Sequence, residues 1–259
     1  MISNLEGLFT LMRREVVRFT TVGAQTVFPP LISSGLFMFI FGVTIGSRIS
    51  IGQTGWDYFS FLIPGLVTMH AISSSYENTS SSLFIGRWHN HIQEVLLSPL
   101  SYFEMVLGLL TGGIVRGMVV ATGVFLVSLF FSPMTILHPL LLLYLLTTIT
   151  IIFSCAGMLV ALWAEDFNML TVWNTYLIVP LVMLGGVFHP VEILPPILQN
   201  ISKFNPMFYL VSAVRYAVTG VSGTSQTAIW ATALGMLLLA ISIFYFTIYL
   251  FKIGYKLRT

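Results

Sequence analysis

Charged residues are scarce in this chain of 259 residues: only 8% are Asp, Glu, Lys or Arg, whereas 56% are apolar. Soluble domains usually carry about 25% charged residues, and the mean hydropathy here is +0.93. Too little polar surface remains to cover a water-soluble fold of this size. The composition therefore predicts an integral membrane protein, and a net charge of +2 gives no reason to expect a nucleic-acid partner.

Cysteine is nearly absent as well. The single residue, Cys155, lies in an apolar run, so an intrachain disulfide is excluded and the redox compartment is not indicated. A cleavable signal peptide is not apparent, because the first apolar run begins only near Ala24, after a charged leader, and has no small-x-small exit site.

Common catalytic motifs are missing too. The sequence contains no GxxxxGK[ST] phosphate loop, no GxSxG elbow and no HExxH motif. His89 and His91 diverge on a helix and have no third ligand nearby, so we interpret them as part of a solvated polar face rather than a metal site. We expect no catalytic residue, metal or cofactor in this chain, and any energy from ATP must come from another chain.

Six apolar segments are long enough to cross the ~30 Å hydrocarbon core of a bilayer, which needs about 20 helical residues. They are residues 25–46, 58–80, 105–131, 140–163, 170–188 and 228–251. We find no internal repeat, low-complexity linker or second domain. The sequence therefore predicts an all-α integral membrane protein with six transmembrane helices, in a single transmembrane domain over residues 1–259.

A charged leader, residues 1–23, precedes the first of these segments. Its expected apolar stripe consists of Leu5, Leu8, Phe9, Met12, Val16 and Phe19. The opposite face carries Glu6, Arg13, Glu15 and Arg18. This pattern is typical of an amphipathic helix lying in the membrane interface, with Arg13, Arg14 and Arg18 as its basic residues.

Lysine and arginine counts predict the orientation, because cytoplasmic segments are enriched in both. With the N-terminus inside, the inside set is Arg13, Arg14, Arg18, Arg87, Lys252, Lys256 and Arg258. The outside set is Arg48, Lys203 and Arg215, and Arg116 lies within a span. Seven against three favours both termini in the cytoplasm, together with the segment between the second and third spans.

That segment, residues 85–100, reads IGRWHNHIQEVLLSPL. At helical spacing its apolar face consists of Phe84, Trp88, Ile92, Val95 and Leu96. The other face consists of Arg87, His89, Asn90, His91, Gln93 and Glu94. Because Pro99 ends the pattern, we expect one short amphipathic helix over residues 84–97, of about three turns, which acts as a docking surface.

Trp88 is a large candidate anchor within this surface, since aromatic side chains dominate buried interfaces. It faces either a docked partner or the helix bundle beneath. Because its stripe continues Phe84 and Ile92, we favour the bundle. The polar face then meets the partner, with Arg87 and Glu94 as charge contacts.

Two charged residues are expected deep in the spans. An arginine within a bilayer normally faces protein or water and has a partner, and Glu77 is the candidate nearest in depth to Arg116. We predict that the two pair inside the bundle; the alternative is that Arg116 snorkels to the headgroups. The second span also carries many hydroxyls, which indicate interhelical hydrogen bonds or a wet surface, and Gly108, Gly112, Gly113 and Gly117 allow close helix approach.

The outer segment 189–227 is longer than an ordinary loop, and its apolar runs are too short to form a seventh span. Its apolar spacing predicts two short amphipathic helices separated at Asn205-Pro206. We expect a re-entrant helical hairpin over residues 189–220, with its broken backbone shielded by protein. Phe188, Pro190 and Phe208 are candidate gate residues; the alternative is that they anchor the hairpin at the lipid interface.

Three features together carry a resemblance to a known family. They are IPGLVTMHAISSSYENTSSSLFIGRWHNHIQEVLLSPLSYFEMVLGLLTGG (63–113), LGGVFHPVEILPPILQNISKFNPMFYLVSAVRY (184–216) and the six-span hydropathy behind a basic leader. The chain resembles the type-2 ATP-binding-cassette exporter permeases, closest to the YadH-type branch near the lipo-oligosaccharide and drug-export permeases. One departure is that many relatives carry an "RE-x-G" run where this chain has Gly86-Arg87-Trp88-His89-Asn90.

The resemblance implies a half-transporter that pairs with a second copy of the permease and with two copies of an ABC ATPase, which holds the ATP and magnesium. The implied coupling helix, inserted into the ATPase, contributes Gly86, Arg87, Asn90, His91, Gln93, Glu94 and Leu97. The leader resembles the connecting helix that also touches the ATPase. The implied outer hairpin and gate contribute Gly185, Gly186, Phe188, Pro190, Leu194, Pro195, Asn205, Pro206, Phe208 and Arg215.

We therefore expect a permease subunit of an ATP-driven exporter in the bacterial inner membrane, not an enzyme. Its expected substrate is amphipathic: lipid-like, glycan-linked or drug-like. The alternative is a membrane anchor that regulates an ATPase without transport. An intramembrane enzyme using Glu77, His70 or His189 is disfavoured, because no nucleophile–base pair or metal set falls at one depth.

Overall fold

A computed structural model of the chain describes residues 2–44, 58–221 and 225–257, and every regular element within these ranges is a helix. In chain order the α-helices are α1 (Ile2–Thr21), α2 (Gly23–Thr44), α3 (Tyr58–Trp88), α4 (Ile92–Leu97), α5 (Tyr102–Ser128), α6 (Pro139–Trp163), α7 (Phe167–Trp173), α8 (Val179–Leu184), α9 (Pro196–Phe204), α10 (Pro206–Thr219) and α11 (Gln226–Lys252). A π-helical turn, η2 (Asn174–Ile178), joins α7 to α8, and a 3-10 turn, η3 (Val191–Ile193), precedes α9.

Each of the six predicted spans overlaps helical residues, although α5 ends at Ser128 and the fifth predicted span is divided into α7, η2 and α8, which ends at Leu184. Within the described residues, five segments are long and apolar enough to cross a membrane: Gly23–Gly42, Tyr102–Ser128, Pro139–Trp163, Phe167–Leu184 and Gln226–Lys252. Helix α3 covers the predicted second span, 58–80, but continues to Trp88, and its polar half keeps it out of this group. Residues 45–46 of the first predicted span, Arg48 in the first outer loop, and Arg258 lie outside the described residues.

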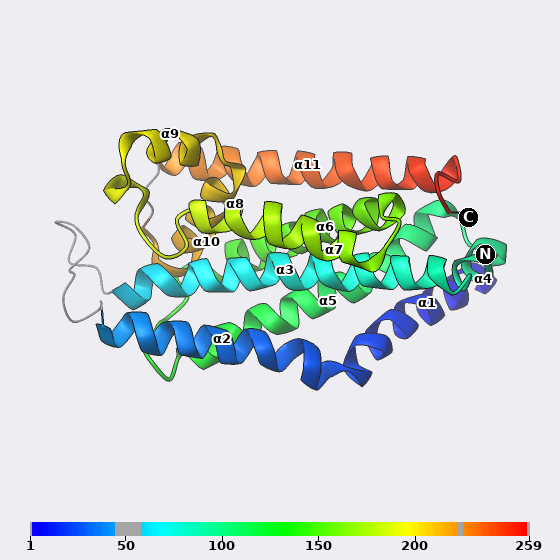
Figure 1. Cartoon of the computed structure of the whole chain (residues 1–259), viewed down its shortest axis with the longest axis horizontal. Helices are drawn as coiled ribbons and strands as arrows, with labels where there is room; N and C mark the ends of the chain where they lie inside the picture. The colour runs from blue at the N-terminus through cyan, green and yellow to red at the C-terminus, as the bar shows by residue number, and fades with distance from the viewer. Residues whose placement is uncertain (1, 45–57, 222–224, 258–259) are drawn as a thin grey trace.

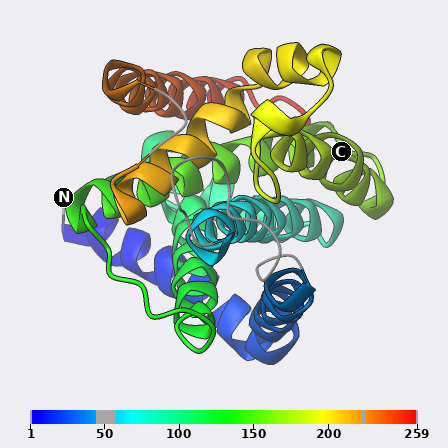
Figure 2. The same ribbon diagram turned by 90° about the vertical axis from the view of Figure 1, so that its left-hand side faces the viewer.

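The long helices run side by side along the long axis of the molecule (Figure 1). The start of α1, all of α4 and the end of α11 lie together at one end of the bundle, which we name the α4 end. Helices α9 and α10 lie at the opposite end, the α9 end. Seen end-on in Figure 2, α3 occupies the centre, with the other long helices around it.

The polar half of α3 is buried against protein. Ser74, Ser75, Asn78, Thr79 and Ser80 are each at most 2% exposed. The Thr79 hydroxyl donates to the Ser154 carbonyl of α6 at 2.8 Å, and also approaches the carbonyls of its own helix. The hydroxyls of Ser75, Thr79 and Ser80 therefore donate to backbone carbonyls inside the bundle, which is the packing explanation rather than the wet surface.

Small residues let α5 and α6 approach α3 and α1 closely. A methyl group at Gly113 would meet Thr79 at 2.6 Å, and one at Gly112 would meet Asn78 at 2.7 Å. Gly108 faces Leu11 of α1, at 2.5 Å from such a methyl group. The glycine spacing on α5 thus forms the close-approach surface that the sequence predicted.

Gly157 of α6 offers the sharpest test of this packing. A Cβ there would lie 2.5 Å from the Tyr76 carbonyl oxygen, which is backbone and does not yield. Gly157→Ala is expected to lower the free energy of unfolding by about 1–3 kcal/mol through overpacking, seen as a melting temperature several degrees lower in detergent. Gly235→Ala on α11 is the matched control, because nothing lies within 4 Å of its Cβ position. Equal melting temperatures for the two variants would refute the close-packing assignment.

Candidate functional site

The segment predicted as one helix over residues 84–97 is two helices. Helix α3 continues through Gly86 to Trp88, a turn follows at residues 89–91, and α4 runs from Ile92 to Leu97. Asn90 has a φ of 61°, a left-handed conformation that asparagine tolerates better than most residues. This single residue interrupts the helix and rotates α4 relative to α3, which the helical spacing of the sequence did not reveal.

Helix α4 nevertheless has the predicted two faces. Ile92 and Val95 are buried in a cluster formed with residues of α1, α3, α5 and α6. His91, Gln93 and Glu94 are exposed, with the His91 Nδ1 3.6 Å from Glu94 Oε1. The polar side of the docking surface is therefore directed away from the bundle.

Trp88 does not face the bundle, contrary to our expectation. Its side chain is 67% exposed, while its ring stacks on Phe84 at 6.0 Å between centroids. Leu97, at the other end of the segment, is 87% exposed. The break at Asn90 separates Trp88 from the Ile92 stripe, and two large apolar side chains are therefore exposed at the two ends of the segment.

Arg87 was expected to contact a partner, but its guanidinium is hydrogen-bonded within this chain. Its guanidinium NH1 donates to the Ala161 carbonyl and, at 3.3 Å, to the Ala164 carbonyl. These carbonyls belong to the end of α6, where the helix leaves its last acceptors unpaired and carries partial negative charge. Burial lowers the pKa of the Arg87 guanidinium, although an arginine stays charged at neutral pH. Arg87 therefore caps α6 and ties it to α3.

A pocket of about 460 Å³ lies beside this segment. Its lining consists of Phe84, Arg87, Trp88, Asn90, Ala164, Glu165 and Lys256. Lys256 lies 3.8 Å from Glu165 across the pocket. The α6–α7 connection and the residues after α11 thus lie beside the segment predicted as a docking surface and line the same pocket.

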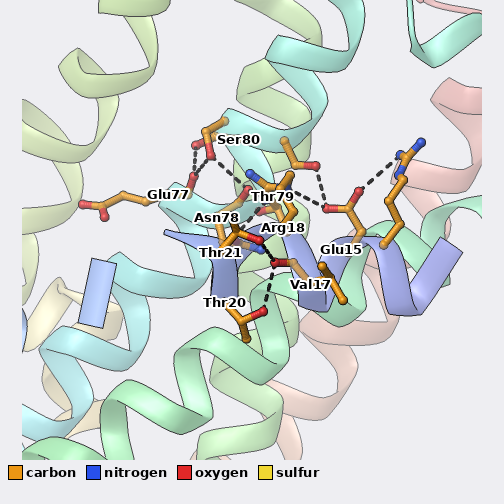
Figure 3. A network of polar contacts seen from close by, with 12 residues as sticks. Glu15, Val17, Arg18, Thr20, Thr21, Glu77, Asn78, Thr79 and Ser80 are labelled. Carbon is orange, nitrogen blue, oxygen red and sulfur yellow. Dashed lines mark hydrogen bonds and ion pairs between the residues drawn. The ribbon is translucent and has the colours of Figure 1, made fainter. Parts of the chain in front are cut away.

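Helix α1 is bonded to α3 by a buried carboxylate (Figure 3). Glu15 is 0% exposed, and its Oε2 accepts from the Ser82 hydroxyl at 2.6 Å and from Arg18 Nε at 3.3 Å. Arg18 NH2 continues to the carbonyl and side-chain oxygens of Asn78, at 2.9 and 3.0 Å. Placing Glu15 on the outward polar face was therefore wrong: this part of α1 packs on the bundle, while Arg13 and Arg14 remain exposed.

The predicted pair of charged residues inside the bundle is present. Arg116 NH2 of α5 lies 3.1 Å from Glu77 Oε2 of α3. The amide of Asn174, the first residue of η2, donates to the other carboxylate oxygen at 2.9 Å. The Arg116 side chain is 9% exposed and that of Glu77 46%, so the pair opens onto the side of the bundle. The hydrogen bond of Asn174 to Glu77 was not predicted, although an asparagine within an apolar span indicates a polar contact.

The predicted hairpin consists of α9 and α10, divided at Asn205-Pro206. Asn205 accepts from the Met207 amide at 3.0 Å and donates to the Leu181 carbonyl, which ties the hairpin to α8. Arg215, 4% exposed, donates to the Gly186 carbonyl at 2.7 Å and lies 3.7 Å over the Phe61 ring. The turn at Gly186, with φ of 81°, is thus held against α3.

Phe188 connects the hairpin segment to two spans. Its ring lies 5.2 Å from Phe37 and 6.0 Å from Phe41 of α2, between centroids. Its carbonyl accepts from the Tyr58 hydroxyl at the start of α3, at 3.0 Å. The α9 end of the face between α2 and α8 is therefore closed by aromatic side chains.

The remaining residues predicted for the hairpin have local roles. Gly185 is buried against Met207, Pro190 and Pro195 precede η3 and α9, and Leu194 follows η3. Pro206 begins α10, and the Phe208 ring packs on Tyr209 at 5.3 Å. These positions build the hairpin rather than a reactive centre, and within the described residues no cluster of three His, Cys, Asp or Glu could hold a metal ion.

The sequence profile of the ABC-2 type transporter family matches residues 6–219. The chain belongs to this family. Similarity extends to the inner membrane transport permease YadH of Escherichia coli K12, 34% identical over 239 residues, 92% of this chain and 91% of the relative. Nodulation protein J of Rhizobium leguminosarum bv. viciae is 26% identical over 189 residues, and that of Neorhizobium galegae 27% over 187, each covering 71% of both chains.

As an ABC-2 permease, the chain is a transmembrane subunit of an ABC transporter, and the resemblance found in the sequence is confirmed. Members of this family normally pair with a separate ABC ATPase subunit. The inner-membrane relative and the apolar helices support a multi-pass protein of the bacterial inner membrane.

Replacement of Arg87 distinguishes a residue that stabilises the end of α6 from one that contacts a partner. Arg87→Gln removes a charged donor from the end of α6 and is expected to lower the free energy of unfolding by about 1–2 kcal/mol, measured by thermal unfolding of the isolated permease in detergent. The control is His89→Gln at a neighbouring exposed position, which is expected to unfold like the wild type. An Arg87→Gln protein of unchanged stability would instead indicate that the side chain serves a partner.

Proposed function

We propose that this permease is half of an ATP-driven exporter and that its α4 end docks a separate ATPase in the cytoplasm. The observation that carries the proposal is the exposure of Trp88 and Leu97 around the polar face of α4. Large apolar side chains that stand outside the membrane on a polar surface are typical of an interface core with a polar rim. The chain itself has no phosphate-binding loop, so a partner must hydrolyse the ATP.

In this proposal α3 also crosses the membrane, so that it and the five candidate spans make six. Both termini lie in the cytoplasm. Most of the polar half of α3 is covered by α1, α5 and α6, and Glu77 is its exposed charged residue. The seven lysines and arginines assigned to the inner side, against three outside, support this orientation. Helix α1 lies along the inner interface, where Arg13 and Arg14 are exposed to the headgroups and the docked ATPase.

A second copy of the permease is expected to cover the face between α2 and α7–α8. These are the least buried of the five candidate spans, and Glu77 opens between them at membrane depth. A half-exposed carboxylate is costly against lipid, which supports a second subunit or water on this side. The substrate path then follows this face, from Glu77 in the half nearer the α4 end to Phe188 at the α9 end.

The hairpin closes this path on the outer side. Phe188 is the gate residue that the contacts favour, because it joins the hairpin to both α2 and α3. Arg215 and Asn205 hold the hairpin in place, while Pro190 and Phe208 support its turns. The alternative function, an anchor that regulates an ATPase without transport, would show ATPase stimulation in reconstituted vesicles but no ATP-dependent movement of an amphipathic cargo.

The docking face predicts the effect of charge reversal. Gln93→Lys combined with Glu94→Lys is expected to weaken co-purification of the ATPase subunit at least about tenfold, because it places two cations on the exposed face of α4. The buried face, with Ile92 and Val95, is untouched, so the permease itself is expected to stay folded and membrane-inserted. The measurement is the ATPase retained per permease after affinity purification from membranes.

Gln226→Lys at the other end of the bundle is the control, because it adds a cation on an exposed residue far from α4. It is expected to retain the full amount of ATPase. Equal retention by the α4 double variant and this control would overturn the assignment of the docking face.

A further inference from the structure

The polar group around Glu77 lines a pocket of about 250 Å³ between α3, α5 and α7–η2. Its lining consists of Tyr76, Glu77, Ser80, Ser81, Arg116, Phe167, Leu170, Thr171 and Asn174. Asn174 is seven residues from the start of α7 and Glu77 eleven from the end of α3, so both lie about 10–16 Å from the α4 end. The pocket is therefore within the inner half of a ~30 Å hydrocarbon core.

The pocket carries no net charge. Glu77 is neutralised by Arg116 at 3.1 Å. On the far side of α3, outside the lining, Arg18 pairs with Glu15 at 3.3 Å, and Glu15 also pairs with Arg14 at 3.3 Å (Figure 3). Neither a cationic nor an anionic head group is favoured by such a balanced site, since each would repel one member of the ion pair while attracting the other.

Two polar atoms of the lining are buried without a hydrogen bond. Among the described residues, Arg116 Nε and Asn174 Oδ1 have no partner. A buried polar atom that stays unpaired costs free energy, so each such atom requires an explanation. One is a donor and the other an acceptor, and both residues also bind the same Glu77 carboxylate. A hydroxyl group can satisfy both, because it donates and accepts at once.

The local backbone fits a pocket that adapts to a ligand. Asn174 is the first residue of the π-helical turn η2, and π turns occur frequently at functional sites. Phe167 and Leu170 give the pocket an apolar edge, while the Tyr76 hydroxyl is already used by the Leu170 carbonyl at 3.0 Å. An amphiphile can thus place its polar head against Glu77 and Asn174 and its chain along the open side.

We propose that this pocket binds the uncharged, hydroxyl-bearing head group of the transported amphiphile. Arg116 donates to a head-group hydroxyl, and the oxygens of Asn174 and Glu77 accept from hydroxyls of the same head group. The inference rests on the proposed function, because it assigns the substrate chemistry of the path described above. It narrows the expected lipid-like, glycan-linked and drug-like substrates to neutral polyols on an apolar anchor.

The test uses the permease with its co-purified ATPase in phosphatidylcholine vesicles, and measures the ATPase rate as probe lipids are added. The probes are monoglucosyl diacylglycerol, its permethylated form, phosphatidylglycerol and stearylamine, with free glucose to separate the head group from the whole amphiphile. Monoglucosyl diacylglycerol is expected to stimulate the ATPase most. The permethylated form, which accepts but cannot donate hydrogen bonds, and the two charged lipids are expected to stimulate several-fold less.

Two variants locate the response in the pocket. Asn174→Leu is expected to raise the half-stimulating concentration of the glucolipid about tenfold, the effect of losing one or two well-placed hydrogen bonds. Glu77→Gln leaves Arg116 uncompensated and is expected to shift the preference to the anionic phosphatidylglycerol. Ser242→Leu, an exposed polar residue of α11 outside the pocket, is the matched control and is expected to respond like the wild type.

Equal responses to the parent and permethylated glucolipids, or identical responses of Asn174→Leu and Ser242→Leu, would overturn the pocket assignment while the complex still assembles. Failure of the proposed function looks different: the permease would retain no ATPase, or the ATPase would be stimulated without any movement of lipid. If Asn174→Leu does not purify as a folded complex, the charge preference of Glu77→Gln decides the question by itself.

Discussion

The close approach of α3 to α5 and α6 is the constraint on which the rest of this structure depends. A helix with hydroxyls and an asparagine through half of its length is stable in a membrane only if protein covers it on most sides. Gly113 and Gly157 provide this cover, because they bring neighbouring backbones within reach of Thr79 and Ser80. The apolar helices outside can then meet lipid, and most polar contacts of the bundle converge on one central helix.

Two neighbouring residues of α3 make polar contacts on opposite sides of the helix. Glu77 points toward Arg116 and the pocket on the open face, while Asn78 is bound by Arg18 of α1. Any rotation of α3 therefore acts on the contact with the interfacial helix and on the pocket at the same time. In the proposed function, a ligand in the pocket and an ATPase on α1 or α4 would be linked through the orientation of a single helix, which would be a physical basis for coupling.

Much of this architecture was predictable because a bilayer imposes length and composition on each span. The six segments, the division of the hairpin at Asn205-Pro206 and the pairing of Glu77 with Arg116 all follow from the cost of placing polar groups in hydrocarbon. The prediction from helical spacing was wrong for residues 84–97, because this segment is not one continuous helix. The left-handed Asn90 shifts the phase after Trp88, so Trp88 no longer shares a stripe with Ile92. The contact of Arg87 with the end of α6 depends on a neighbour distant in sequence, which helical spacing does not reveal. Asn174 escaped prediction because its partner lies 97 residues away in sequence.

Helix α3 runs unbroken for 31 residues, from Tyr58 beside Phe188 to Trp88 beside the docking surface. At ~1.5 Å per residue this is about 46 Å, longer than the hydrocarbon core by half again. In the proposed orientation the two ends of this helix emerge on opposite sides of the membrane. Because the helix is continuous, a tilt that displaces Trp88 also displaces Tyr58. In that arrangement, a change in the aromatic contacts of Phe188 outside is expected to alter the contact of Trp88 with the ATPase inside, so that one stretch of backbone connects the two compartments.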